Sequence, residues 1–177
     1  EPDRVPIWDF IDSWPIYQHF APGETDITLA TAKVFNGLGI DLCRSVYMPQ
    51  PPDTEGIEGD HGTHKTKVSG KTHWMVEYPI KTLDDLKQWD SVMPTEEEIW
   101  NEVNWVLEVR DIFAPQTMYV PGGGVGFHAA YGSMGLTLFS LALYDARDHI
   151  ERMIDNLNRQ NCIRAKAYAE ANISPLF

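Results

Sequence analysis

The sequence predicts a mixed α/β fold. Short segments rich in β-forming residues alternate with longer segments whose apolar residues recur at helical spacing. An early pair of strands with a tight turn interrupts this alternation, and glycine and proline separate the segments. Strands alternating with helices favour a layer or a barrel with a parallel core. A complete (β/α)₈ barrel takes about 250 residues, so this chain of 177 residues would supply only part of one.

The first part of the chain predicts a strand, a helix and a second strand, followed by a surface loop. Thr25 or Asp26 is a suitable N-cap for the helix, and Gly37 and Gly39 are suitable stops. The loop is rich in proline, glycine and acids. The expected ranges are 5–8, 26–38, 40–47 and 48–60.

The middle of the chain predicts a hairpin and two helices. The hairpin has strands at 66–68 and 72–76 around a turn that contains Gly70. Thr82 and Asp85 form a capping-box pattern at the start of a short helix that ends near Trp89. A long amphipathic helix opens at residue 95, with acids in its first turn.

The last part predicts a strand at 117–120 and a glycine loop at 121–126, followed by helices at about 127–134 and 136–143. Asp145 is the expected cap of a final helix, and an apolar strand is expected at 173–177. A strand there would need partners for its backbone and side chains. We therefore expect the sequence to be part of a longer protein.

Charge and cysteine content narrow the function classes. The chain carries 14 Lys and Arg against 26 Asp and Glu, a net charge of −12. Such an acidic chain is repelled by phosphate backbones and anionic lipid, so nucleic-acid and membrane partners are not expected. The two cysteines, Cys43 and Cys162, do not form a C-x-x-C pair, which fits a reducing compartment and a cytoplasmic protein.

The glycine loop is the first candidate site. Residues 124–129 resemble a dinucleotide fingerprint, with Asp145 about twenty residues further on. However, Asp145 is expected at a helix start rather than a strand end, and Pro121 interrupts the approach. Gly123 and Gly124 are therefore expected to admit an anionic or large ligand rather than a dinucleotide.

The histidines are a second candidate group. His61, His64 and His73 lie close together in sequence, but they fall in an expected loop and hairpin, where solvated histidines are more common than metal ligands. His128 follows the glycine loop, and Tyr131 lies one helical turn later. The pair can line a pocket and handle protons, or His128 can simply pack against or cap the helix.

Three further residues are substrate-binding candidates. Arg44 lies near the end of the second expected strand, where it suits a carboxylate or phosphate, or pairs with one of the many acids. Glu77 lies at the end of a hairpin strand and is a weaker candidate of the same kind. Trp8 suits a flat ligand, with core packing as its alternative.

The order of five segments resembles the uroporphyrinogen decarboxylase superfamily. The segments are 4–8 (RVPIW), 38–41 (LGID), 78–89 (YPIKTLDDLKQW), the glycine loop with 129–135 (AAYGSMG), and 143–153 (LYDARDHIERM). The last is similar to the family's L-Y-x-x-P-E helix start, with Arg147 where Pro is usual. The resemblance implies that residues 1–177 form about the N-terminal half of one (β/α)₈ barrel domain, a TIM-barrel fold, with an early β-hairpin insertion and no second domain.

The resemblance also implies an enzyme of one of two branches. One branch decarboxylates porphyrinogens in heme biosynthesis, and it uses an arginine-rich segment after the first strand. Residues 9–17 contain no arginine, and Arg44 lies where this branch has an Asp, although Tyr131 matches its pocket tyrosine. The other branch transfers methyl groups between a corrinoid (cobamide) and a thiol or folate. Its zinc ligands lie in the second half of the barrel, so Cys43 and Cys162 are not assigned to a metal.

The sequence thus predicts a cytoplasmic methyltransferase of this superfamily. We expect Tyr131 and His128 to be catalytic, and we expect the substrate to contact Arg44, Trp8, Gly123, Gly124 and Glu77. A small-molecule substrate, a corrinoid protein and a second copy of the chain are the expected partners. Porphyrinogen decarboxylation is the alternative. A non-catalytic assembly subunit, which would bury an open sheet edge against a partner, is the second alternative.

Overall fold

The computed structural model describes residues 5–49, 51, 58–60, 65–69, 72–90 and 92–174. It is a mixed α/β structure with small sheets, none of them closed, so the predicted α/β class is confirmed. The half-barrel stays a prediction. The chain divides into two compact units. We call residues 1–53, 96–122 and 167–177 unit 1, and residues 54–95 and 123–166 unit 2.

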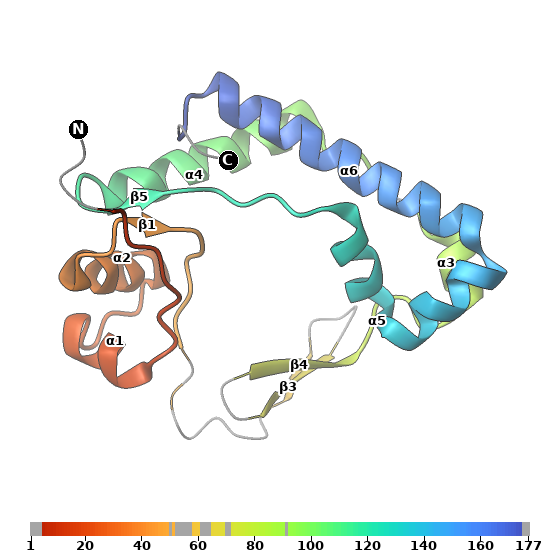
Figure 1. Cartoon of the computed structure of the whole chain (residues 1–177), viewed down its shortest axis with the longest axis horizontal. Coiled ribbons are helices and arrows are strands. Elements are labelled where there is room, and N and C mark those ends of the chain that lie inside the picture. The colour runs from red at the N-terminus through yellow and green to blue at the C-terminus, as the bar shows by residue number, and fades with distance from the viewer. Residues whose placement is uncertain are drawn as a thin grey trace. The chain divides into compact units, whose positions relative to one another are not determined.

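Unit 1 contains a small parallel sheet. Strand β1 (Leu42–Cys43) pairs in parallel with β5 (Met118–Tyr119), and the two lie side by side in Figure 1. Trp8 forms an isolated parallel bridge with Leu42. Three segments of the chain therefore lie parallel, and their order in space is their order in the sequence. The parallel core is as predicted, but its strands are shorter than the expected ranges 5–8, 40–47 and 117–120.

Helices α2 (Ile27–Leu38) and α4 (Glu96–Phe113) pack against each other in unit 1. Asp26 caps α2 by accepting a hydrogen bond from the Leu29 N–H, and Gly39 ends it in the left-handed conformation, as predicted. The helices share a core of small and branched apolar side chains with two phenylalanines, including Ala30, Val34, Phe35, Val103, Val106, Val109 and Phe113.

The sequence analysis missed helix α1 (Trp14–Phe20), which packs on α2. Its signal is weak, because it has seven residues and no side-chain N-cap hydrogen bond. The one usable sign is Pro15 near its start, since proline is favoured in the first turn of a helix. Tyr17 is its buried residue and enters the core of unit 1.

Unit 2 contains an antiparallel sheet in the order β2-β3-β4, with β2 at Glu58–Asp60, β3 at Lys65–Ser69 and β4 at Thr72–Glu77. The hairpin of β3 and β4 is as predicted. Strand β2 was expected to be loop, because three polar or glycine residues give no strand pattern by themselves. Helix α3 (Leu83–Gln88) begins with the predicted capping box of Thr82 and Asp85.

The rest of unit 2 is helical. Helix α5 (Gly126–Asp145) is broken at Gly135, as the two predicted helices at 127–134 and 136–143 require. Helix α6 spans Arg147–Glu170, and its last four residues belong to unit 1. The predicted cap at Asp145 is wrong. The α5 backbone continues through Asp145 and ends at Ala146, whose N–H donates to the Ala142 carbonyl.

The end of the described chain is not a strand. Ile173 is buried and Ser174 is partly buried, and neither has the secondary structure of a strand. The remaining residues of the strand expected at 173–177 lie outside the described residues. A strand needs a hydrogen-bonded neighbour. The apolar pattern that predicted this strand contains no information about such a neighbour.

Candidate functional site

The parallel segments of unit 1 bring Trp8, Arg44 and Gly122 together. Arg44 directly follows β1, and Gly122 follows β5 by three residues. The Arg44 guanidinium carbon lies 5.6 Å from the centroid of the Trp8 ring. A Cβ added at Gly122 would lie 3.9 Å from Nη2 of Arg44. The carboxyl ends of parallel strands meet at one edge of a sheet, which is where α/β proteins bind ligands.

Arg44 is available to an anionic ligand. The sequence analysis left open a salt bridge to one of the many acids, but among the residues that the structure describes Arg44 forms no ion pair. Its side chain is exposed and stacks on Trp8 in a cation–π contact. A guanidinium held in this way presents a planar set of donors that matches a carboxylate or a phosphate.

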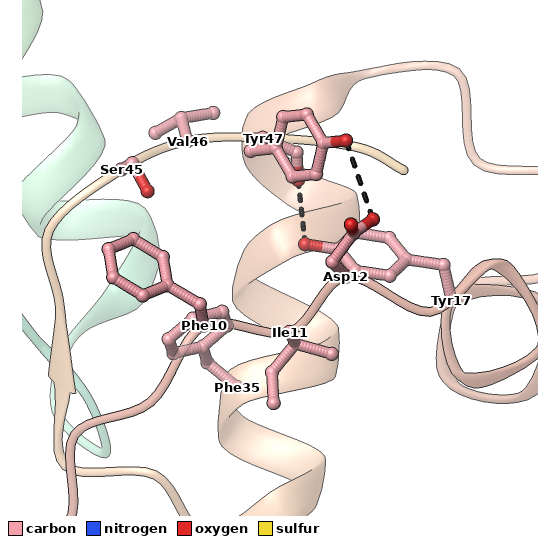
Figure 2. A pocket seen from close by; sticks show the side chains of 8 residues that line it. All are labelled: Phe10, Ile11, Asp12, Tyr17, Phe35, Ser45, Val46 and Tyr47. Carbon is pink, nitrogen blue, oxygen red and sulfur yellow. Dashed lines mark hydrogen bonds between the residues drawn. The ribbon is translucent and has the colours of Figure 1, made fainter. Parts of the chain in front are cut away.

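A pocket of about 470 Å³ lies at the same carboxyl ends, within unit 1. Its walls come from the segment after the Trp8 bridge, from the segment after β1, and from α1 and α2 (Figure 2). Phe10 in this wall makes an edge-to-face contact with Trp8 at 5.3 Å between ring centroids, so the pocket adjoins the Arg44–Trp8 pair. The lining residues are Phe10, Ile11, Asp12, Tyr17, Phe35, Ser45, Val46 and Tyr47.

The hydroxyl groups of two tyrosines form hydrogen bonds on the polar side of this pocket. The Tyr17 hydroxyl donates to the backbone carbonyl of Tyr47 at 2.6 Å, and the Tyr47 hydroxyl donates to Oδ1 of Asp12 at 3.4 Å (Figure 2). The Thr31 hydroxyl donates to the same carbonyl at 2.9 Å. Burial raises the pKa of Tyr17. Burial, followed by the Asp12 charge, raises the pKa of Tyr47. Both phenols therefore remain protonated donors at neutral pH.

The sequence analysis did not single out Asp12, Tyr17 or Tyr47. Tyr17 and Tyr47 are 30 residues apart, and Tyr47 and Asp12 are 35 residues apart. No local spacing relates residues so distant in the chain. The one available signal was position, because Asp12 follows one predicted strand of a parallel sheet and Tyr47 is the last residue of the next, where ligand-binding residues concentrate.

In unit 2, the structure brings the predicted catalytic pair into contact. The Tyr131 hydroxyl lies 2.8 Å from Nδ1 of His128 on the first part of α5. The rings of Phe127 and Phe139 lie 5.8 and 6.3 Å from the Tyr131 ring, centroid to centroid. The phenol and the imidazole are therefore one hydrogen-bonded group, partly walled by aromatic rings.

Helix α6 anchors the glycine loop through two asparagines. Asn158 accepts a hydrogen bond from the Gly126 N–H at 2.7 Å, and the Asn161 side-chain amide donates to the Gly124 carbonyl. A Cβ at Gly126 would lie 2.5 Å from the Ile154 carbonyl oxygen, so only glycine fits where α5 approaches α6. The sequence analysis missed Asn158 and gave Asn161 no role at the loop.

Glu77 has partners of its own in unit 2. Its carboxylate forms ion pairs with Lys81 and, at 2.9 Å, with Lys65. The hydrogen bonds from Lys81 and Lys65 lower the pKa of Glu77 to about 2. These contacts tie the end of β4 to β3 and to the start of the next segment. They give Glu77 a structural role, and a substrate contact by Glu77 stays a prediction.

The predicted site residues divide between the two units. Arg44 and Trp8 lie together in unit 1, whereas Tyr131 and His128 lie together in unit 2 with Gly123, Gly124 and Glu77. A single pocket that includes both groups stays a prediction.

The part of the chain that the structure describes shows no metal centre. Among the described residues, no group of three or more His, Cys, Asp or Glu side chains is placed to bind a metal ion. Cys43 is buried, which raises its pKa to about 11. His61 and His64 lie outside the described residues. The pocket of about 470 Å³ has the size of a site for a drug-sized ligand. Within the described chain, no helix has the length and apolar character needed to cross a membrane.

Comparisons of the chain with models of protein families, with curated proteins and with solved structures found no match. Its function is therefore inferred from the geometry of the site and from the order of its sequence motifs.

Proposed function

We propose that the chain is part of a (β/α)₈-barrel enzyme similar to the uroporphyrinogen decarboxylase superfamily, and that it transfers a methyl group from a corrinoid to a thiol or folate acceptor. The observation that supports this most is the placement of Arg44. It stacks on Trp8 beside Gly122, at the carboxyl ends of three parallel segments whose order in space is their order in the sequence. That edge is the active face of a (β/α)₈ barrel.

Arg44 binds the anionic group of the methyl acceptor in this proposal. Trp8 fixes the plane of the guanidinium, and glycine at position 122 leaves room for the acceptor's carboxylate, sulfonate or phosphate next to Nη2. The chain supplies this contact within unit 1 alone. It therefore does not depend on how the second half of a barrel is built.

His128 and Tyr131 handle the proton of the reaction. Methylation of a thiol forms a carbon–sulfur bond and releases the thiol proton, which a neutral imidazole can accept. The bond that would break is the one between the methyl group and its corrinoid carrier, and its electron pair would stay with the carrier. The contact between the Tyr131 hydroxyl and Nδ1 fixes the imidazole ring. In the tautomer that carries its proton on Nδ1, this N–H donates to the Tyr131 oxygen, and Nε2 is the nitrogen that accepts the thiol proton. A separate corrinoid protein is the proposed carrier of the methyl group.

The test is an assay of the full-length protein with methylcobalamin and a small thiol that bears a carboxylate or sulfonate. Demethylation is followed by the change in the visible spectrum. Arg44→Gln should raise KM about tenfold or more with a smaller effect on kcat, and Arg44→Lys should lie between it and the wild type. Arg159→Gln, which removes an exposed arginine of unit 2, should leave both constants unchanged.

Two results would replace the proposal. If methylcobalamin is not demethylated and uroporphyrinogen is converted to coproporphyrinogen, the protein is a decarboxylase and Arg44 binds a substrate carboxylate. If neither reaction occurs and size-exclusion chromatography shows a stable assembly, the protein is a non-catalytic subunit.

A further inference from the structure

The pocket of Figure 2 offers a ligand a mainly apolar surface. Four of its lining side chains are apolar, and they are Phe10, Ile11, Phe35 and Val46. The two phenols and the carboxylate in its wall already have partners. The Tyr17 hydroxyl donates to the Tyr47 carbonyl, and the Tyr47 hydroxyl is directed at Asp12. The body of a ligand in this space therefore packs against carbon atoms.

Two aromatic rings at the apolar side of this pocket are exposed. Phe10 is 66% exposed and Trp8 is 46% exposed, and the two rings contact each other edge to face. In Figure 2, Phe10 and Phe35 lie on one side of the pocket, and Asp12 lies with the two phenols on the other. Large apolar side chains that lie together on a surface are typical of binding sites. Covering them with an apolar group removes their surface from water, which favours binding.

Arg44 adds one positive charge beside these rings. Its guanidinium carbon lies 5.6 Å from the centroid of the Trp8 ring, and the Trp8 ring in turn contacts Phe10 of the pocket wall. Two ring contacts therefore separate the cation from the pocket. A ligand can reach both when a spacer of a few atoms joins its charged group to its apolar body.

We infer that the methyl acceptor is an amphipathic anion, with its carboxylate, sulfonate or phosphate on Arg44 and its apolar or aromatic body in the pocket against Phe10 and Phe35. The inference rests on the proposed function, in which Arg44 binds the acceptor's anionic group, and it adds the part of the acceptor that Arg44 does not hold. None of the eight described lining residues is a lysine or an arginine, so the pocket takes the uncharged end of the ligand.

The experiment measures binding to the full-length protein by calorimetric titration, with no methyl donor present. The probes are 4-phenylbutyrate, which has both parts, butyrate, which lacks the ring, and 4-phenylbutan-1-ol, which lacks the charge. The phenyl acid should bind about tenfold more tightly than butyrate, because its ring is buried in the pocket. It should bind about fivefold more tightly than the alcohol, because the charge contact with the exposed Arg44 is partly screened.

Two variants separate the two contacts. Arg44→Gln should abolish the preference for the phenyl acid over the alcohol, and Phe10→Ala should reduce the preference for the phenyl acid over butyrate about threefold or more. The matched controls are Arg159→Gln and Tyr144→Ala, which remove an exposed arginine and an exposed aromatic ring from unit 2. Both should bind all three probes as the wild type does. Circular dichroism spectra establish that each variant is folded.

Three results would overturn the inference. They are equal binding of the phenyl acid and butyrate, an Arg44→Gln variant that keeps the preference for the acid over the alcohol, and a Phe10→Ala variant that binds every probe as the wild type does. Failure of the proposed function has a different signature. Methyl transfer is then absent from the methylcobalamin assay, whereas the titrations, which contain no corrinoid, still show the preference for the phenyl acid.

Discussion

The ring of Tyr78 lies against the backbone of Gly135, so that a Cβ added at this glycine would be 2.9 Å from two carbons of the ring. Gly135 has φ 74° and ψ 157°, a conformation that breaks α5 into two helices. Just before the break, the Ser133 carbonyl accepts a hydrogen bond from the Ile80 N–H at 3.0 Å. The segment after β4 therefore packs on α5, within unit 2, at the point where the helix is interrupted.

Gly135→Ala should destabilise the protein by about 1–3 kcal/mol, because the backbone conformation is almost restricted to glycine and the new methyl group meets the Tyr78 ring. Gly132→Ala is the matched control in the same helix. A Cβ there meets nothing within 4 Å, so this change should stabilise by up to about 1 kcal/mol through helix propensity. Urea unfolding measures both, and an equal effect of the two variants would contradict the role of the break.

The contact between Tyr131 and His128 predicts the tautomer of the imidazole. The proposed proton acceptor is Nε2, so neutral His128 should carry its proton on Nδ1 and donate it to the Tyr131 oxygen. Two-dimensional ¹H–¹⁵N NMR spectra of the ring nitrogens show directly which nitrogen carries the proton. Tyr131→Phe should shift the Nδ1 resonance of His128 and leave that of His149 in place, since His149 contacts Arg152 instead. An unprotonated Nδ1 in the wild type would show that Tyr131 is the donor and that Nε2 is not the proton acceptor.

The ion pairs of Glu77 predict a contribution to stability that depends on pH. Its pKa is lowered from its usual 4.5 to about 2 by hydrogen bonds from Lys81 and Lys65. A depressed carboxyl pKa stabilises the folded state above pH 4.5, and this stabilisation is lost as the pH falls toward 2. The difference in free energy of unfolding between the wild type and Glu77→Gln should therefore shrink over that interval, and added salt should reduce it at neutral pH.

Glu108→Gln is the control for this measurement. Glu108 is an exposed acid of α4 without an ion pair among the residues that the structure describes. Its removal should not give the loss between pH 4.5 and 2 that Glu77→Gln shows. A Glu77→Gln difference that is constant with pH would mean that the ion pairs do not stabilise the fold.

The two cysteines should differ in reactivity. Cys43 is fully buried in the core of unit 1, and burial raises its pKa to about 11. Cys162 is exposed on α6. The thiolate is the reactive form, so iodoacetamide should label Cys162 in the native protein and Cys43 only after unfolding. Mass spectrometry of Cys162→Ser should show no native labelling. Rapid native labelling of Cys43 would instead show that the core around β1 opens.

Elements with local end signals were predicted well. Asp26 and Gly39 lie at the two ends of α2, and the capping box of Thr82 and Asp85 starts α3. These ends were predictable because a cap satisfies backbone groups within one turn of the helix. Elements without such signals were missed or misplaced. Helix α1 and strand β2 are short, and the backbone runs helically through Asp145, where a cap was expected.

The candidate site was predictable in its residue types but not in its groupings. Residue type and position selected Arg44, Trp8, His128 and Tyr131, and the last two are in fact hydrogen-bonded because one helical turn separates them. No local sequence pattern indicated the pocket with Asp12 and Tyr47, because its walls come together only through the packing of segments that are distant in sequence.

The sequence by itself determined the α/β class, most helix boundaries, the hairpin and the break at Gly135, because each depends on residues within a few positions of one another. Only the tertiary structure decided that Arg44 stacks on Trp8, that Asn158 anchors the glycine loop, and that two phenols and Asp12 share a pocket. These contacts join residues at least 30 positions apart. They form when apolar surfaces are buried together, and no local propensity specifies them.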